Sequence, residues 1–261
     1  NIAMQADLPL PEGATRYLRR GNQPVESEAL GSIDSGSPST LRDFLMWGLK
    51  ELPTDNVALV IGGTGIFDPN SVVGLPDHNW TDVFAICDDA PARNALEIAE
   101  LRSVLEAVLD EIGIDRLRIV AFDMCRMQFL EIAYELETVA DLVIAAQTGV
   151  PADGLNYQQL LESLGSALAN AKNGSLEDVA KRIVDEAAES YTSKASYEIV
   201  ISALDLRRLD DLSRDFDAFT LAYMQALGDW IAWTARDTVS GSSELSEEHS
   251  YDLRGALVAI K

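Results

Sequence analysis

The stretch Leu117-Arg-Ile-Val-Ala-Phe122-Asp123-Met124-Cys125 decides the fold of this chain. Leu117 to Phe122 is a short, mostly apolar run, which is typical of a strand buried in a parallel sheet. The residues after Cys125, as far as Leu136, have the pattern of a helix. In an open parallel sheet, reacting and ligand-binding groups gather at the carboxyl ends of the strands. Cys125 is therefore expected at a functional edge of the sheet.

Apolar runs of strand length recur along the chain and predict several further strands. They are Ile2 to Gln5, Thr15 to Leu18, Val57 to Ile61, Val83 to Cys87, Leu142 to Ala146 and Tyr197 to Ala203. Val57 to Ile61 is wholly apolar, which predicts a buried strand. It stops abruptly at Gly62-Gly63-Thr64-Gly65.

Amphipathic stretches separate these runs and predict helices. They run from Ser39 or Thr40 to Lys50, Asn94 to Ile112, Cys125 to Leu136, Tyr157 to Ala171, Ser175 to Tyr191, Leu206 to Arg236 and Tyr251 to Lys261. The alternation predicts an α/β fold in which helices cover both faces of a mostly parallel central sheet. We expect one domain over residues 1–261, with the sheet core in 1–150 and a mainly helical continuation in 151–261.

The chain is strongly acidic, with 43 Asp and Glu against 20 Lys and Arg and a net charge of -23. Such a surface repels phosphate backbones, which argues against a nucleic-acid partner, and it attracts cationic peptides or divalent ions. The alternative is simply an acid-rich, soluble surface. No apolar run is long enough to span a membrane. Asn1 to Asp7 lacks the features of a signal peptide and reads as a strand already under way, so the compartment is left open.

Cys125 has two interpretations when judged by its position alone. The chain has two cysteines, Cys87 and Cys125, which is too few for a disulfide framework. A thiol at the start of a helix faces free backbone N–H groups, which favour the thiolate and could bind an oxyanion. The other interpretation is a small, buried apolar residue, the commonest fate of a free cysteine.

Several motifs resemble the clostripain family of cysteine peptidases (peptidase family C11). Phe122-Asp-Met-Cys-Arg-Met127 and Glu131-Ile-Ala-Tyr-Glu-Leu136 resemble its strand, Asp-x-Cys and helix signature. Pro151-Ala-Asp-Gly-Leu-Asn-Tyr157 is similar to its Pro-x-Asp-Gly-Trp-x-Tyr loop. Segments further away match in the same order: Thr15 to Tyr17, Leu41 to Trp47, Ala203 to Leu206 and Tyr251 to Leu253. The resemblance implies a caspase-like (clan CD) three-layer sandwich and a secreted or cell-surface enzyme that cuts after arginine or lysine.

The resemblance assigns roles to individual residues. It makes Cys125 the nucleophile and Asp123 and Asp153 the carboxylates of a pocket for a basic side chain. The alternatives are a helix cap for Asp123 and a turn former for Asp153. The family's histidine lies in a His-Gly-x-Gly motif, and here Gly62 takes the place of that histidine. Gly63 would then supply the backbone N–H of an oxyanion site.

Glycine cannot accept a proton, so the resemblance implies a weakened enzyme. General acid–base help is typically worth about 10²- to 10⁴-fold in rate. The sequence therefore predicts a catalytically impaired peptidase homologue that keeps an acidic pocket for arginine or lysine side chains of a peptide or protein. The alternative is an active endopeptidase cleaving after arginine with a non-standard base such as His78. His249 is a weaker candidate, because it lies in a polar, acidic stretch.

No cofactor is expected, although the resemblance admits calcium because the family includes calcium-responsive members. Asp88-Asp89 lies in a loop where such a site could form. Two adjacent acids fall short of the six to eight oxygen ligands that calcium requires. A solvated turn is the default interpretation of this pair.

Overall fold

The computed structural model describes residues 1–7, 13–67, 84–87, 95–151, 154–162, 175–193 and 198–226. The chain forms two compact units, Asn1–Leu204 and Asp205–Lys261, which are described separately. The expected organisation as one domain stays a prediction. The helix expected at Tyr251 to Lys261 lies outside the described residues.

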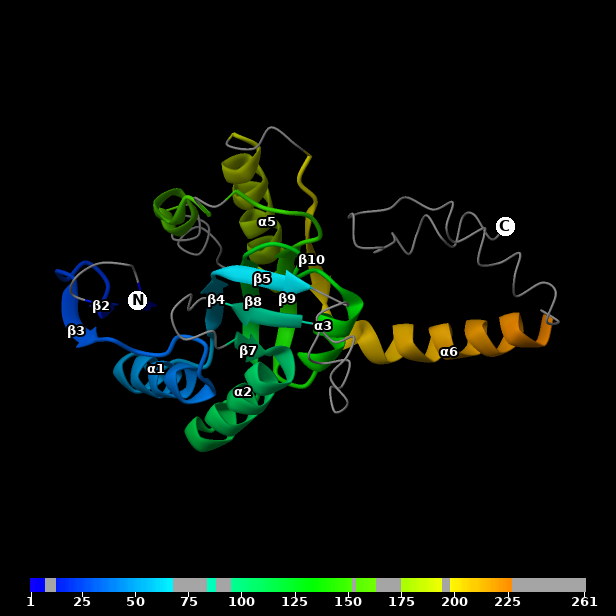
Figure 1. Ribbon diagram of the computed structural model, residues 1–261, viewed down its shortest axis with the longest axis horizontal. Helices are drawn as coiled ribbons and strands as arrows, with labels where there is room; N and C mark the ends of the chain where they lie inside the picture. The colour runs from blue at the N-terminus through cyan, green and yellow to red at the C-terminus, as the bar shows by residue number, and fades with distance from the viewer. Residues whose placement is uncertain are drawn as a thin grey trace. The chain divides into compact units, whose positions relative to one another are not determined.

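A four-stranded sheet forms the centre of the first unit (Figure 1). Its order is β10 (Ile201–Asp205), β9 (Ala140–Ala146), β8 (Leu117–Asp123) and β4 (Ala58–Gly62). β8 runs parallel to β4 on one side and to β9 on the other. β9 is buried throughout and β8 at all but one position, as their apolar sequences predict. The prediction of a mostly parallel sheet is confirmed, although β10 begins later than the expected Tyr197.

β4 is less buried than its sequence predicts. Only Leu59 of this strand is buried, and Val60 is 40% exposed. β4 is the last strand in the order of this sheet, so among the described residues it has a sheet neighbour on one side only. The expectation of a fully buried strand is wrong, because an apolar run does not distinguish a central strand from an outer one.

The other strands of the described residues form two smaller antiparallel sheets. β1 (Ile2–Ala6), β2 (Ala14–Arg19) and β3 (Glu26–Gly31) form one of them. The first two strands were predicted, whereas β3 is too polar to be recognised. β5 (Thr64–Phe67), β6 (Phe84–Cys87) and β7 (Ala95–Glu97) form the other. The strand predicted at Val83 to Cys87 is present as β6, but it pairs antiparallel with β5 and does not join the parallel sheet.

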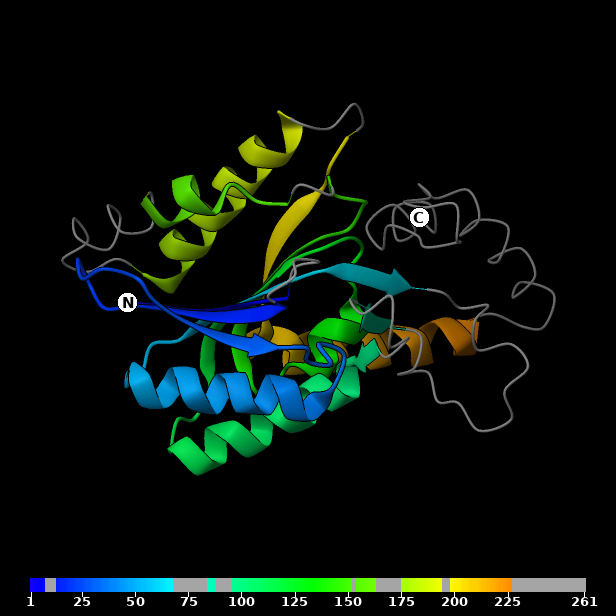
Figure 2. The same ribbon diagram turned by 60° about the vertical axis from the view of Figure 1, so that its left-hand side comes forward.

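The helices lie on both sides of the parallel sheet. Figure 2 shows α1 (Pro38–Glu51) and α2 (Ile98–Ile112) on one side and α5 (Leu176–Thr192) on the other. Leu155, Leu160 and the α5 residues Ala180, Ile183, Ala187 and Tyr191 pack on alternate side chains of β8 and β9 to form a hydrophobic cluster. Leu155 and Leu160 belong to the segment that leads from β9 to α5, so this segment contributes to the cluster.

Two predicted helix starts need correction. α1 begins at Pro38 after the N-cap Ser37, not after Ser39 or Thr40, because proline is well suited to the first turn of a helix. α2 begins after Glu97, whose side chain forms a capping box with Glu100. The expected start at Asn94 is wrong because β7 takes up the intervening residues. By contrast, α5 begins where the helix was expected, directly after its cap Ser175.

The second unit is helical in its described part. A short 3-10 helix at Leu206–Arg208 leads into α6 (Leu209–Ala226), as predicted from Leu206 onward. Among the described residues, no helix has the length and apolar character needed to cross a bilayer.

Candidate functional site

Cys125 lies in a turn directly after β8. Its thiol is free and half-buried. The chain does not enter a helix there, because α3 spans only Leu130–Glu135. The expectation that Cys125 begins a helix is therefore wrong, and support from a helix dipole is lost with it.

The backbone amides after Cys125 already donate hydrogen bonds within the protein. The N–H of Arg126 donates to the carbonyl of Thr148 at 3.1 Å, and those of Met127 and Gln128 donate to Ala146 at 3.0 and 3.1 Å. These bonds tie the turn to the end of β9, and Arg126 adopts a left-handed backbone conformation with a φ of 55° to allow them. Amides bonded in this way are not free to bind an oxyanion.

The Cys125 sulfur contacts one backbone unit of the neighbouring segment. The N–H of Val150 donates to Sγ at 3.3 Å, and the thiol donates to the carbonyl of Val150 at 3.8 Å. This donor and this acceptor fix the sulfur beside the chain that follows β9. The backbone contacts to the sulfur that were expected from the start of a helix therefore come from the segment that follows β9.

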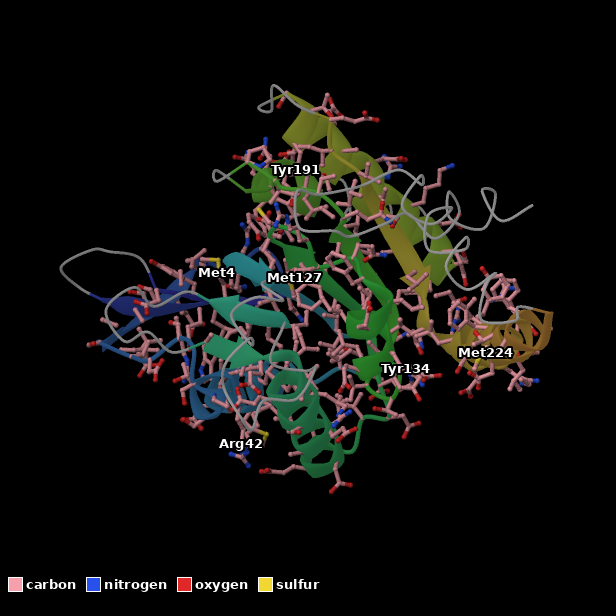
Figure 3. All side chains as sticks on the ribbon, turned by 45° about the vertical axis from the view of Figure 1, so that its right-hand side comes forward. Met4, Arg42, Met127, Tyr134, Tyr191 and Met224 are labelled. Atoms are coloured by element: carbon pink, nitrogen blue, oxygen red, sulfur yellow. The ribbon has the colours of Figure 1, made fainter. Side chains whose placement is uncertain are left out.

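Asp123, the last residue of β8, is only 7% exposed and accepts three hydrogen bonds. Its Oδ2 accepts from the backbone N–H of Leu155 at 2.9 Å and from the hydroxyl of Tyr157 at 2.8 Å. Its Oδ1 accepts from the hydroxyl of Tyr191 at 2.6 Å. Tyr191 is fully buried near the end of α5 (Figure 3). The carboxylate thus joins β8, the segment after β9, and α5.

Both tyrosines are held as neutral phenols. Burial, together with the adjacent Asp123 carboxylate, raises the pKa of Tyr157 and of Tyr191 well above the usual value for a phenol. Each hydroxyl therefore keeps its proton near neutral pH and donates a hydrogen bond to Asp123. Neither phenol can serve as a general base under these conditions.

Gly154 allows this arrangement. Its φ is 62°, and a Cβ at this position would lie 2.7 Å from Oδ2 of Asp123. Any larger residue would push the carboxylate away, so the glycine of the loop motif has a steric reason here. Sequence reasoning found Tyr157 within the motif but gave it no role, and no local signal indicated Tyr191.

Gly62 lies at the same edge of the sheet. It is the last residue of β4, is exposed, and is in register with Asp123 of β8. A Cβ at Gly62 would lie 3.5 Å from the hydroxyl of Tyr157, which is ordinary van der Waals contact. The structure thus brings Gly62, Asp123 and Tyr157 together next to the turn of Cys125.

Comparison with known proteins decides the family. The sequence profile of the clostripain family, peptidase C11, matches residues 15–252. The chain belongs to the clostripain family. No curated protein matches the chain.

Solved structures of C11 proteases share the fold, which is α/β and caspase-like. One is a secreted C11 cysteine protease from Bacteroides thetaiotaomicron called iotapain, at 24% identity and a TM-score of 0.56, covering 77% of this chain and 54% of its own. Another is a secreted C11 cysteine protease of the same organism bound to an irreversible peptide inhibitor, at 18% identity and a TM-score of 0.61, with coverages of 95% and 64%. An inactive zymogen C11 protease from Parabacteroides distasonis has 20% identity, a TM-score of 0.53 and coverages of 94% and 62%. This clostripain-family chain therefore spans between 54% and 64% of the length of these proteins.

Several residues predicted for the clostripain-type site lie outside the described residues. These are His78, His249 and Asp153. Gly63 directly follows β4, and its role as an oxyanion donor stays a prediction. Asp88 and Asp89 also lie outside the described part of the chain. Among the described residues, no group of three His, Cys, Asp or Glu could hold a metal ion.

Proposed function

We propose that this chain is a clostripain-family cysteine peptidase homologue with strongly reduced proteolytic chemistry, which binds peptides carrying arginine or lysine. The observation that carries this proposal is Gly62. By the motif resemblance it takes the place of the family's histidine, and it lies in register with Asp123 at the edge of the sheet next to Cys125. The neighbouring hydroxyl of Tyr157 is a bound donor and cannot replace the missing base.

The chemistry separates binding from turnover. Peptide hydrolysis requires that the thiol lose a proton and that the leaving amine gain one, and an imidazole normally performs both transfers. Attack on an electrophile whose leaving group needs no proton requires only the first of these transfers, the loss of the thiol proton. The Cys125 thiol is free and only half-buried, so such an electrophile should still be captured.

The test compares capture with hydrolysis. The protein is incubated with a peptidyl-arginine acyloxymethyl ketone and, separately, with a fluorogenic arginyl peptide amide. We expect one adduct per chain, located at Cys125 by mass spectrometry and absent from Cys125→Ala, with no alkylation-sensitive turnover of the amide. Turnover that alkylation abolishes would support the alternative of an active endopeptidase using His78 or another base. The His78→Ala variant would then show whether His78 or another group is the base.

The proposed partner is a peptide or protein with exposed basic residues, which a net charge of -23 would attract. The same charge disfavours nucleic acid. Two of the related structures are described as secreted proteases, and we propose a secreted or cell-surface location for this chain as well. No cofactor is proposed. Adduct formation that falls on addition of a calcium chelator would revive the calcium hypothesis.

A further inference from the structure

We propose that a cavity between the β1–β3 sheet and α1 binds a small organic acid, with the carboxylate of the acid on Arg16 and its apolar body against the cavity wall. β1 packs directly on α1, where a Cβ added to Gly48 would lie 3.2 Å from the Cβ of Ala3 (Figure 2). The cavity has a volume of about 540 Å³, which is in the range of small-molecule sites. Its described lining includes no residue of the strands and segments around Cys125. The site is therefore separate from the candidate peptidase site, and the inference does not rest on the proposed function.

Basic side chains gather at this cavity, although the chain has few of them. The whole chain carries 20 Lys and Arg against 43 Asp and Glu. The described lining of the cavity has three basic residues, Arg16, Arg42 and Lys50, and two acidic ones, Asp43 and Glu111. Glu111 is paired with Arg42 at 2.5 Å, so the charges of these two largely cancel. The rest of the lining is net positive, which is the reverse of the chain as a whole and attracts an anion.

Arg16 is held in position by neutral groups. It lies on β2 opposite Gln5 of β1, whose side-chain oxygen accepts a hydrogen bond from Arg16 Nε at 2.9 Å. The guanidinium carbon lies 5.0 Å from the centre of the Trp47 ring, which is a cation–π distance. Within the described part of the chain, neither terminal NH₂ group of Arg16 has a hydrogen-bond or ion-pair partner. These two groups form a planar fork that matches the two oxygens of a carboxylate.

Apolar side chains form another part of the wall. Leu30 of β3 and Ile33, which follows this strand, are half-buried, and Met46 of α1 is buried. An alkyl chain placed against them gains affinity, by about fourfold for each CH₂ group that is fully buried. A fixed cation beside apolar walls therefore suits an acid with a short alkyl chain.

The experiment titrates the protein with hexanoate, with acetate and with the uncharged hexanamide, followed by ¹H–¹⁵N NMR. We expect hexanoate to move the Arg16 Nε–H signal and the Met46 amide signal to saturation, while the amide signal of Val143 in β9 stays. Acetate should bind at least about fivefold more weakly because it lacks the buried CH₂ groups. Hexanamide should bind at least about tenfold more weakly because it lacks the charge. Absence of saturation up to about 10 mM hexanoate, or equal binding of hexanoate and either analogue, overturns the proposal.

Arg16→Gln should weaken hexanoate binding by at least about tenfold, because it removes the charged fork. Arg19→Gln is the matched control, since Arg19 belongs to the same strand, is exposed and does not line the cavity. This control should keep the affinity for hexanoate within about twofold of the wild type. An equal loss in both variants would show that only the net charge of the protein matters, and would overturn the proposal.

Two exposed variants on α1 decide the question if Arg16→Gln does not fold. Lys50→Gln removes a positive charge from the cavity lining, and Asp43→Asn removes a negative one. Because each charge is exposed and partly screened, Lys50→Gln should weaken hexanoate binding about two- to fivefold, and Asp43→Asn should strengthen it by a similar factor. Changes of the same sign in the two variants, or no change in either, overturn the proposal.

Discussion

The hydroxyl of Tyr191 donates a 2.6 Å hydrogen bond to Oδ1 of Asp123, which is 68 residues earlier in the chain. The bond joins the end of α5 to the end of β8, the strand that leads into Cys125. Both side chains are buried, so the bond forms where water does not compete and an unpaired partner would be costly. The stability of the fold and the arrangement next to Cys125 therefore depend on the same contact.

Tyr191→Phe should destabilise the protein by about 1–3 kcal/mol, the usual cost of leaving a buried acceptor without its donor. Urea unfolding followed by circular dichroism measures this free energy. Tyr134→Phe is the matched control, because Tyr134 is 59% exposed and a surface change of this kind stays within about 0.5 kcal/mol. Equal stability of the two variants would contradict the importance of the bond.

Gly154→Ala and Gly113→Ala form a second matched pair. Both glycines have a positive φ, 62° and 79°, so each alanine costs about 1–2 kcal/mol in backbone strain. Nothing lies within 4 Å of a Cβ at Gly113, whereas a Cβ at Gly154 would meet Oδ2 of Asp123 at 2.7 Å. Gly154→Ala should therefore cost at least about 1 kcal/mol more, since the carboxylate must move from its donors.

Thermal unfolding of the two alanine variants measures the difference. If they unfold at the same temperature, the close approach of Gly154 to Asp123 does not occur in solution.

The parallel sheet could be predicted because β8 and β9 carry their signal locally. Each is a mostly apolar run of strand length, and burial on both faces is the direct consequence. The clostripain motifs around Cys125 could be read in the same local way. They located the turn, the aspartate before it and the loop that ends in Tyr157.

The contacts around Cys125 could not be predicted, because they join distant segments. Residues after Cys125 have a helical pattern, yet their amides bond to the carbonyls of Ala146 and Thr148 at the end of β9. Tertiary hydrogen bonds outweigh the local preference there, so α3 begins only at Leu130. The pairing of Asp123 with Tyr191 likewise leaves no mark on the sequence near either residue.

Gly62→His should raise proteolytic activity, because the site accepts a Cβ without rearrangement. A Cβ at Gly62 makes only an ordinary 3.5 Å contact with the Tyr157 hydroxyl. An imidazole at the end of β4 would supply general acid–base help worth about 10²- to 10⁴-fold in rate. Hydrolysis of a fluorogenic arginyl peptide amide, measured as kcat/KM, tests this expectation.

Gly62→Ala controls for the added Cβ and should stay inactive, as should the double variant Gly62→His with Cys125→Ala. Gly62→His that folds, binds an arginyl peptide aldehyde and yet hydrolyses nothing would show that more than the imidazole is missing.

Alkaline pH should weaken the protein through its two buried phenols. The pKa of Tyr191 is raised in the folded protein, chiefly by burial. Its contribution to stability is therefore complete below the pKa of the unfolded chain, about 10, and is lost as pH rises towards the folded value. Above about pH 10, the free energy of unfolding should fall by an extra 1.4 kcal/mol or so per pH unit for each such phenol.

Urea unfolding between pH 8 and 11 compares the wild type with Tyr191→Phe. The stability gap between them should be constant at the lower pH values and should narrow above about pH 10, because only the wild type loses this contribution. Ser190→Ala removes the neighbouring acceptor of the Asn156 N–H without removing a titrating group. The difference in stability between the wild type and Ser190→Ala should therefore not narrow. Parallel curves for the wild type and Tyr191→Phe would mean that the folded protein releases the Tyr191 proton as readily as the unfolded chain does.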